Sequence, residues 1–90
     1  MSRETSILFV CTGNICRSPT AEAVAKALAQ RAEKSLVLDS AGTGDWHVGE
    51  RPDPRAVQAA QARGYDLSGM SARAVTDDDF IRFDHLVAMD

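Results

Sequence analysis

Several features that define large classes of protein are absent from this sequence. Its longest apolar runs are only a few residues, far below the ~18 that span a membrane. Its first residues, MSRETSILFV, lack the apolar stretch and cleavage site of a signal peptide. Its two cysteines, Cys11 and Cys16, lie too close in sequence to hold a fold together. We therefore expect a cytoplasmic protein with no membrane partner and with reactive rather than structural cysteines.

Positive charge and length are also limited. The chain carries 10 Lys and Arg against 13 Asp and Glu, a formal net charge of −3. Nucleic-acid binding depends on basic surfaces that displace phosphate counterions, so we expect no nucleic-acid partner and only local affinity for phosphate. With 90 residues there is room for one small core, and we expect a single domain over residues 1–90. The sequence does not indicate an oligomeric state.

Three short apolar segments, at residues 6–11, 36–41 and 85–89, predict β-strands. Helical patterns separate them in the order strand, helix, strand, loop, helix, helix, strand. This order implies parallel strands with right-handed crossovers and predicts an open, flavodoxin-like parallel sheet in a three-layer α/β/α arrangement. Ligands of such sheets bind beyond the carboxyl ends of the strands, where Cys11 and the loop after it would lie.

Each predicted helix begins with a capping residue. Ser18 followed by proline predicts a helix to about residue 33, whose apolar positions are Ala21, Val24, Ala25, Leu28, Ala29 and Ala32. Asp53 followed by proline predicts a second helix that ends at a glycine, residue 64. Thr76, with an acidic residue three positions later, resembles a capping box ahead of a short third helix.

The segment CTGNICRS between the first strand and the first helix has the composition of an anion-binding loop. Backbone N–H groups in such a loop, at the positive end of a helix dipole, bind a tetrahedral anion. Gly13 permits a backbone conformation that a side chain would resist, and Asn14 tolerates a positive φ. The same positive field lowers the pKa of Cys11, Ser18 can donate a hydrogen bond to its sulfur, and Arg17 can bind two phosphate oxygens.

A Cys-x5-Arg spacing also arises by chance, and a cysteine at a strand end is often a buried hydrophobic residue. The strand, glycine and capped helix around Cys11 favour the functional interpretation. CTGNICRSP closely resembles the active-site signature of low-molecular-weight protein tyrosine phosphatases. DSAGTGDWHVGERPDPRA at residues 39–56 and FDHLVAMD at residues 83–90 are similar to that family too.

The resemblance implies a function, a sheet of four parallel strands, and no metal or organic cofactor. The substrate would be a phosphotyrosine protein or a small aryl phosphate, hydrolysed through a cysteinyl-phosphate intermediate, and phosphate or other oxyanions would also bind. Cys11 would be the nucleophile and Arg17 the phosphate clamp, while Asn14 and Ser18 would organise the loop. The phosphate-binding residues would be Thr12, Gly13, Asn14, Ile15, Cys16, Arg17 and Ser18.

Two more residues gain a role from the resemblance, each with an open alternative. Cys16 would form a reversible disulfide with Cys11 that protects the nucleophile from over-oxidation, or it packs in the loop. Trp46, the only tryptophan, would form a wall of the substrate cleft, or it folds back onto the core. His47 and His85 have no identifiable partner in the sequence, and we expect surface or structural roles for both.

The family also implies a part of the mechanism that we do not find in this chain. Its general acid is an Asp-Pro on a loop beyond the third strand, and members run longer, so the chain resembles a form truncated after that strand. The single Asp-Pro here, at Asp53, opens a predicted helix, and we do not assign it as the acid. Three alternatives stay open: an arsenate reductase, which usually needs a further pair of redox cysteines; a phosphoarginine phosphatase, whose members carry threonine in place of Ile15; and a non-catalytic oxyanion-binding module.

Overall fold

The structure is a computed structural model that describes residues 4–89. Its sheet has three parallel strands in the order β2-β1-β3. Their bounds are Thr5–Cys11 for β1, Leu36–Gly42 for β2 and His85–Ala88 for β3. Cys11, the last residue of the central strand, pairs with Gly42, the last residue of β2. The predicted open parallel sheet is therefore confirmed, and the segments that follow β1 and β2 leave it side by side.

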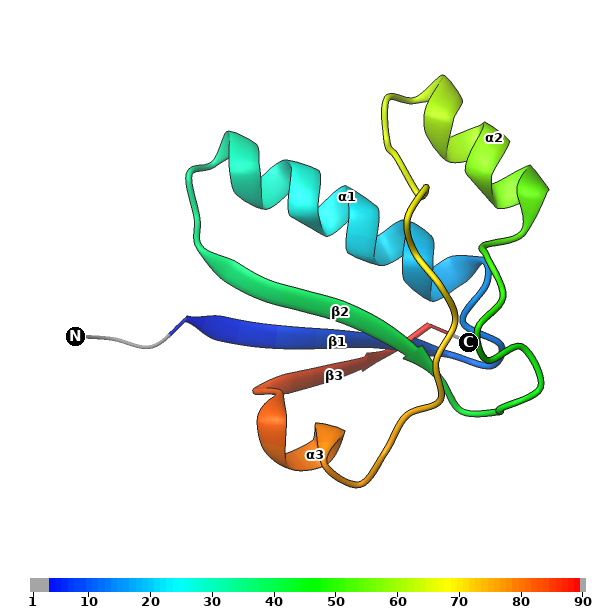
Figure 1. Cartoon of the computed structure of the whole chain (residues 1–90). Coiled ribbons are helices and arrows are strands. Elements are labelled where there is room, and N and C mark those ends of the chain that lie inside the picture. Colours follow the sequence, from blue (N-terminus) through cyan, green and yellow to red (C-terminus); the bar gives the residue numbers. More distant parts are fainter. Residues whose placement is uncertain (1–3, 90) are drawn as a thin grey trace.

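Helices lie on both sides of this sheet (Figure 1). On one side α1 (Arg17–Arg31) packs over β1 and β2, and α2 (Pro54–Ala62) contacts α1. On the other side lies α3 (Asp79–Arg82), a single turn. Three layers result, as the sequence predicts, although the third is thin. No helix within residues 4–89 is long and apolar enough to cross a membrane.

One predicted helix cap, that of α2, is present, and a second, at Thr76, is present in part. Asp53 precedes α2, and its carboxylate accepts a hydrogen bond from the Arg55 N–H at 2.8 Å. Gly64, with φ of 86°, follows the end of α2. Before α3, the Asp79 carboxylate accepts a hydrogen bond from the Thr76 N–H at 2.8 Å, which is the backward half of a capping box.

The apolar core is divided into one cluster on the sheet and another between two helices. Both clusters are small. On the α3 side the buried residues are Leu8, Ala41 and Phe83. Between α1 and α2 they are Ala23, Ala60 and Leu67. Neither cluster is large, so polar contacts contribute to holding α1 against the sheet.

The side of α1 that the sequence marks as apolar is not its buried side. Leu28, the largest side chain on the predicted face, is 52% exposed. The fully or nearly buried residues of α1 are instead Ser18, Pro19, Glu22 and Ala23. The prediction from apolar spacing is therefore wrong for this helix, because the polar residues Ser18 and Glu22 belong to its buried side.

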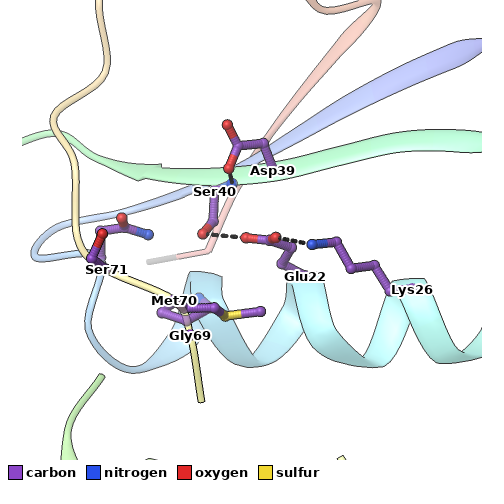
Figure 2. A pocket seen from close by; sticks show the side chains of 9 residues that line it. Glu22, Lys26, Asp39, Ser40, Gly69, Met70 and Ser71 are labelled. Carbon is purple, nitrogen blue, oxygen red and sulfur yellow. Dashed lines mark hydrogen bonds and ion pairs between the residues drawn. The ribbon is translucent and has the colours of Figure 1, made fainter. Parts of the chain in front are cut away.

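Glu22 is the clearest case, with only 6% of the residue exposed. Ser40 on β2 donates a hydrogen bond from Oγ to one carboxylate oxygen at 2.7 Å, and Lys26 lies 2.5 Å from the other. Figure 2 shows the three side chains in a row between α1 and β2, along a polar cavity of about 230 Å³. A buried carboxylate is tolerated when its oxygens are satisfied, and here both are.

Ser40→Ala should therefore destabilise the fold. It leaves one oxygen of the buried Glu22 carboxylate without a partner, and we expect a loss of about 1–3 kcal/mol in the free energy of unfolding. Urea denaturation followed by circular dichroism measures it. Ser35→Ala is a matched control, because Ser35 also donates to a glutamate, Glu4, but at an exposed position; its effect should stay within about 0.5 kcal/mol. Equal effects of the two substitutions would contradict the role of Glu22.

Candidate functional site

The loop after β1 is shaped by its contact with the end of β2. It occupies residues 12–16, between the end of β1 and the start of α1. Gly42 lies against it: a Cβ atom there would be 2.9 Å from the Thr12 carbonyl oxygen and 3.2 Å from the Asn14 nitrogen. No other residue could occupy this position without displacing the loop. The loop is thus held between a strand end and a helix N-terminus.

The sulfur of Cys11 is the focus of the loop. Cys11 is 5% exposed, and its Sγ lies 2.9 Å from Ser18 Oγ and 3.3 Å from the Asn14 backbone nitrogen, which donates to it. Burial alone raises the pKa of the thiol. Hydrogen bonds from Ser18, Asn14 and Gly13 outweigh that effect and leave the pKa of Cys11 below its ordinary value. The arrangement favours a thiolate.

The buried side chains of Asn14 and Ser18 brace the loop from within. Asn14 is 3% exposed, has a φ of 57°, and donates from Nδ2 to Ser18 Oγ at 2.8 Å. Helix α1 begins at Arg17 with Cys16 at the cap position and no side-chain cap. The prediction that Ser18 caps the helix is therefore wrong, because its hydroxyl is engaged by Asn14 and Cys11.

Other predicted loop residues surround an open hollow of about 280 Å³, which is lined by Cys11, Thr12, Gly13, Ile15, Cys16 and Arg17. The Arg17 side chain is exposed, and its Nη1 donates to the Met89 carbonyl oxygen at 3.4 Å. Both cysteines carry free thiols; Cys11 is buried and Cys16 exposed. The hollow is the natural position for an anion at the positive end of α1.

His47 is a neighbour of the loop that sequence reasoning did not find. A Cβ atom on Gly13 would lie 3.0 Å from His47 Cδ2, so this ring, rather than a positive φ, restricts Gly13. Gly13 therefore does not have the unusual backbone that the sequence predicts; a side chain is disfavoured there because the His47 ring packs closely against it. The partner that the sequence could not identify is Glu50, 3.0 Å from His47 Nδ1.

Trp46 lies in the segment that follows β2. Its side chain is well exposed, at 61%, so it does not fold back onto the core. The indole lies directly over Gly44, where a Cβ atom would be 1.6 Å from the ring. Gly44 is in turn bound to the loop, since its N–H donates to the Thr12 carbonyl at 3.0 Å. The Trp46 segment is therefore bound to the loop that follows β1.

Asp53 has the properties of a helix cap and not of an acid. Its backbone N–H donates to the Ile15 carbonyl at 2.7 Å, which places the residue near the loop. However, hydrogen bonds from Arg55 hold the pKa of Asp53 below its ordinary value. A general acid needs a raised pKa to hold its proton near neutral pH, so the prediction that this residue only caps α2 is consistent with its surroundings.

Comparison with known proteins agrees with these features. The model of the low molecular weight phosphotyrosine protein phosphatase family matches residues 6–90. The low molecular weight phosphotyrosine protein phosphatase of Sus scrofa is 47% identical over 87 residues, covering 94% of this chain and 54% of that protein. The chain belongs to this family. It spans about half the length of the curated relatives that it matches.

Solved structures extend the agreement to the fold. A protein tyrosine phosphatase from Entamoeba histolytica, with Hepes in its active site, has a TM-score of 0.93 at 43% identity, covering 97% of this chain and 56% of that one. YfkJ from Bacillus subtilis has a TM-score of 0.93 at 42% identity, covering 99% and 57% of the two chains.

The lowered pKa of Cys11 leads to a direct test. In a Cys16→Ser background, the rate of alkylation by iodoacetamide should follow the Cys11 thiolate, with a midpoint below the ordinary value of about 8.5. Ser18→Ala removes a hydrogen bond to the sulfur and should raise the midpoint by about 1 pH unit. Ser68→Ala, at an exposed turn, is the control and should not move it. An unchanged midpoint in Ser18→Ala would contradict the assigned role.

Proposed function

We propose that this chain acts as a cysteine-dependent phosphatase on phosphotyrosine or small aryl phosphates. The observation that carries the proposal is the Cys11 sulfur, which accepts hydrogen bonds inside an amide-lined hollow at the N-terminus of a 15-residue helix. Such a site favours a thiolate and an adjacent dianion together. Membership of the family supports the reaction class.

The reaction proceeds in two displacements. The Cys11 thiolate attacks phosphorus, the bond from phosphorus to the aryl oxygen breaks, and the phenolate leaves and takes up a proton. Water then attacks the cysteinyl phosphate, the sulfur–phosphorus bond breaks, and inorganic phosphate leaves as the thiolate is regenerated. In both steps the loop N–H groups stabilise the equatorial oxygens. Arg17, now directed toward the Met89 carbonyl, would turn to bind two of those oxygens.

The aryl group would lie against Trp46. Trp46 is not among the residues that line the hollow, but its indole is exposed and its segment is bound to the loop, so it would supply an apolar surface to an aromatic ring that extends out of the hollow. Ile15 adds a further apolar side chain to the lining of the hollow. This lining suits a phenyl ring better than a guanidinium group, which favours an aryl phosphate over a phosphoarginine.

Turnover of two substrates tests the proposal. Within residues 4–89 we assign no general acid, so p-nitrophenyl phosphate, whose leaving group needs little protonation, should be hydrolysed faster than a phosphotyrosine peptide. The difference should be of the order of 10²–10⁴-fold, the contribution of a positioned acid. Equal rates would show that some other group supplies the proton.

Cys11→Ser should reduce both rates to background, because a serine hydroxyl is not ionised in this hollow. Ser68→Ala serves as the control. Turnover that survives Cys11→Ser would overturn the proposal. If the wild type turns over neither substrate but still binds phosphate, measured by calorimetry, a non-catalytic oxyanion-binding module is the better description. An arsenate reductase stays the alternative from the same fold; it would need a further pair of redox cysteines, and the sequence up to residue 90 holds Cys11 and Cys16.

We also propose that Cys16 protects the nucleophile. Peroxide would convert the Cys11 thiolate to a sulfenic acid, and the Cys16 thiol would displace water from it to form a disulfide. Both residues line the same hollow. After peroxide treatment the intact mass of the wild type should match a disulfide that dithiothreitol reverses, whereas Cys16→Ser should progress to the sulfinic acid. A sulfinic acid in the wild type at the same dose would contradict the proposal.

A further inference from the structure

Arg73 joins three parts of the fold at the base of the loop. It lies in the extended segment between α2 and α3. Its guanidinium forms a two-pronged pair with Asp79, with Nη1–Oδ2 at 2.9 Å and Nη2–Oδ1 at 3.1 Å. It also contacts Asp39 on β2, with Nη2–Oδ2 at 3.1 Å. The pKa of Arg73 is raised, first by its hydrogen bond with Asp79, and the pKa of Asp79 is lowered by the same bond. Both groups are therefore charged.

Asp79 is the fixed end of this pair. It is 1% exposed. Besides Arg73, its Oδ2 accepts hydrogen bonds from the Thr76 N–H at 2.8 Å and from Thr76 Oγ1 at 3.2 Å. A buried carboxylate with this many donors has little freedom to move. The Arg73 side chain is therefore anchored from α3, which adds a restraint on the Arg73 backbone.

The backbone of the Arg73 segment is directed at the loop. Its carbonyl accepts from the Gly42 N–H at 2.8 Å, and the Val75 N–H donates to the Gly42 carbonyl at 2.8 Å. These bonds place the segment beside the end of β2. The Arg73 N–H is then free of the β2 pairing and donates to Asn14 Oδ1 at 2.9 Å.

This one N–H determines the direction of a chain of hydrogen bonds. A backbone N–H can only donate, so the oxygen end of the Asn14 amide must face Arg73 and the NH₂ end must face Ser18. Ser18 Oγ accepts from Asn14, and its single proton remains for the Cys11 sulfur, 2.9 Å away. Asn14 and Ser18 are 3% and 0% exposed, so little water competes for these groups.

We propose that Asp79 is a positioning residue for the Cys11 site: it holds Arg73 so that the Arg73 N–H orients Asn14, and the oriented Asn14 directs the Ser18 proton onto the sulfur. Asp79 touches neither the loop hollow nor the sulfur and acts only through this chain. The inference deepens the proposed function, since it concerns the same thiolate. Its test, however, measures the thiol and needs no turnover.

The test is the alkylation midpoint of Cys11 in a Cys16→Ser background. Asp79→Asn keeps the volume of the side chain but loses the charge that holds Arg73. We expect the midpoint to rise by about 0.5–1 pH unit, because the bond from Ser18 to the sulfur is no longer enforced. Direct electrostatics predicts the opposite sign: removal of a nearby negative charge stabilises a thiolate and lowers its pKa. The direction of the shift therefore separates the two explanations.

Two further variants make the result specific. Asp84→Asn is the matched control. Its carboxylate, like that of Asp79, accepts a hydrogen bond from a distant segment, with Ser6 N to Oδ2 at 2.9 Å, but at the opposite end of β1 from Cys11. It should leave the midpoint unchanged. In a Ser18→Ala background, Asp79→Asn should cause no additional shift, because the chain is already broken there.

Circular dichroism first shows that every variant is folded at the temperature of the assay. Each outcome then supports or contradicts the inference. An unchanged or lowered midpoint in Asp79→Asn, a rise in Asp84→Asn of the same size, or a full additional shift in the Ser18→Ala background would overturn the inference. If Asp79→Asn does not fold, Arg73→Lys replaces it: the lysine cannot make the two-pronged pair, and a midpoint equal to that of the wild type would then overturn it. A chain that fails to hydrolyse either phosphate but shows the expected shifts would refute the proposed function and leave this inference in place.

Discussion

The amide of Asn14 is the contact on which the arrangement of the site depends. Its backbone has a φ of 57°, a region that costs a non-glycine residue roughly 1–2 kcal/mol. Three hydrogen bonds offset this cost: the backbone N–H donates to Cys11 Sγ, Nδ2 donates to Ser18, and Oδ1 accepts from Arg73. Asparagine is suited to the position, because it tolerates this backbone and has a donor and an acceptor on one short side chain. Aspartate would put an acceptor where the Ser18 hydroxyl needs a donor.

The distribution of charge around the site explains how an acidic chain can bind an anion. The net charge is −3, yet the positive potential in the hollow comes from oriented N–H groups at the start of α1 and not from a basic surface. Arg73, the cation behind the loop, is neutralised by Asp39 and Asp79. Arg17 is exposed, and among residues 4–89 its guanidinium donates to a backbone carbonyl rather than to a carboxylate, so it would be available to a ligand. The fixed dipoles of the N–H groups at the centre of the hollow and the movable Arg17 side chain at its rim would confine the affinity for an anion to this site.

Sequence reasoning succeeds here where the signal is local and fails where it depends on contacts between distant segments. The strands, the order of elements and the Asp53 cap are encoded in short runs, and the structure confirms them. Ser18 has the pattern of a helix cap, but its hydroxyl serves the sulfur of Cys11, seven residues earlier, which no cap pattern can show. The buried face of α1 was mistaken because Glu22 is polar in the sequence, while the partner that allows its burial, Ser40, is on another strand. Arg73 binds Asn14 from 59 residues away in an unremarkable stretch of sequence.

The two halves of a phosphomonoester hydrolysis have different structural requirements. Generation of a thiolate and binding of the equatorial oxygens need a loop held in one conformation. Residues 11–18 would meet that need through the buried Cys11, Asn14 and Ser18 and the supports at Gly42 and Arg73. Protonation of the leaving group needs a carboxyl with a raised pKa at the open side of the hollow, whereas the nearby Asp53 has a lowered one. Because only the second half depends on the basicity of the leaving oxygen, the proposed function requires the nucleophilic half to act by itself on esters whose leaving group departs as an anion. In the proposed function, the structure of this loop would account for phosphate capture independently of how the phenol is released.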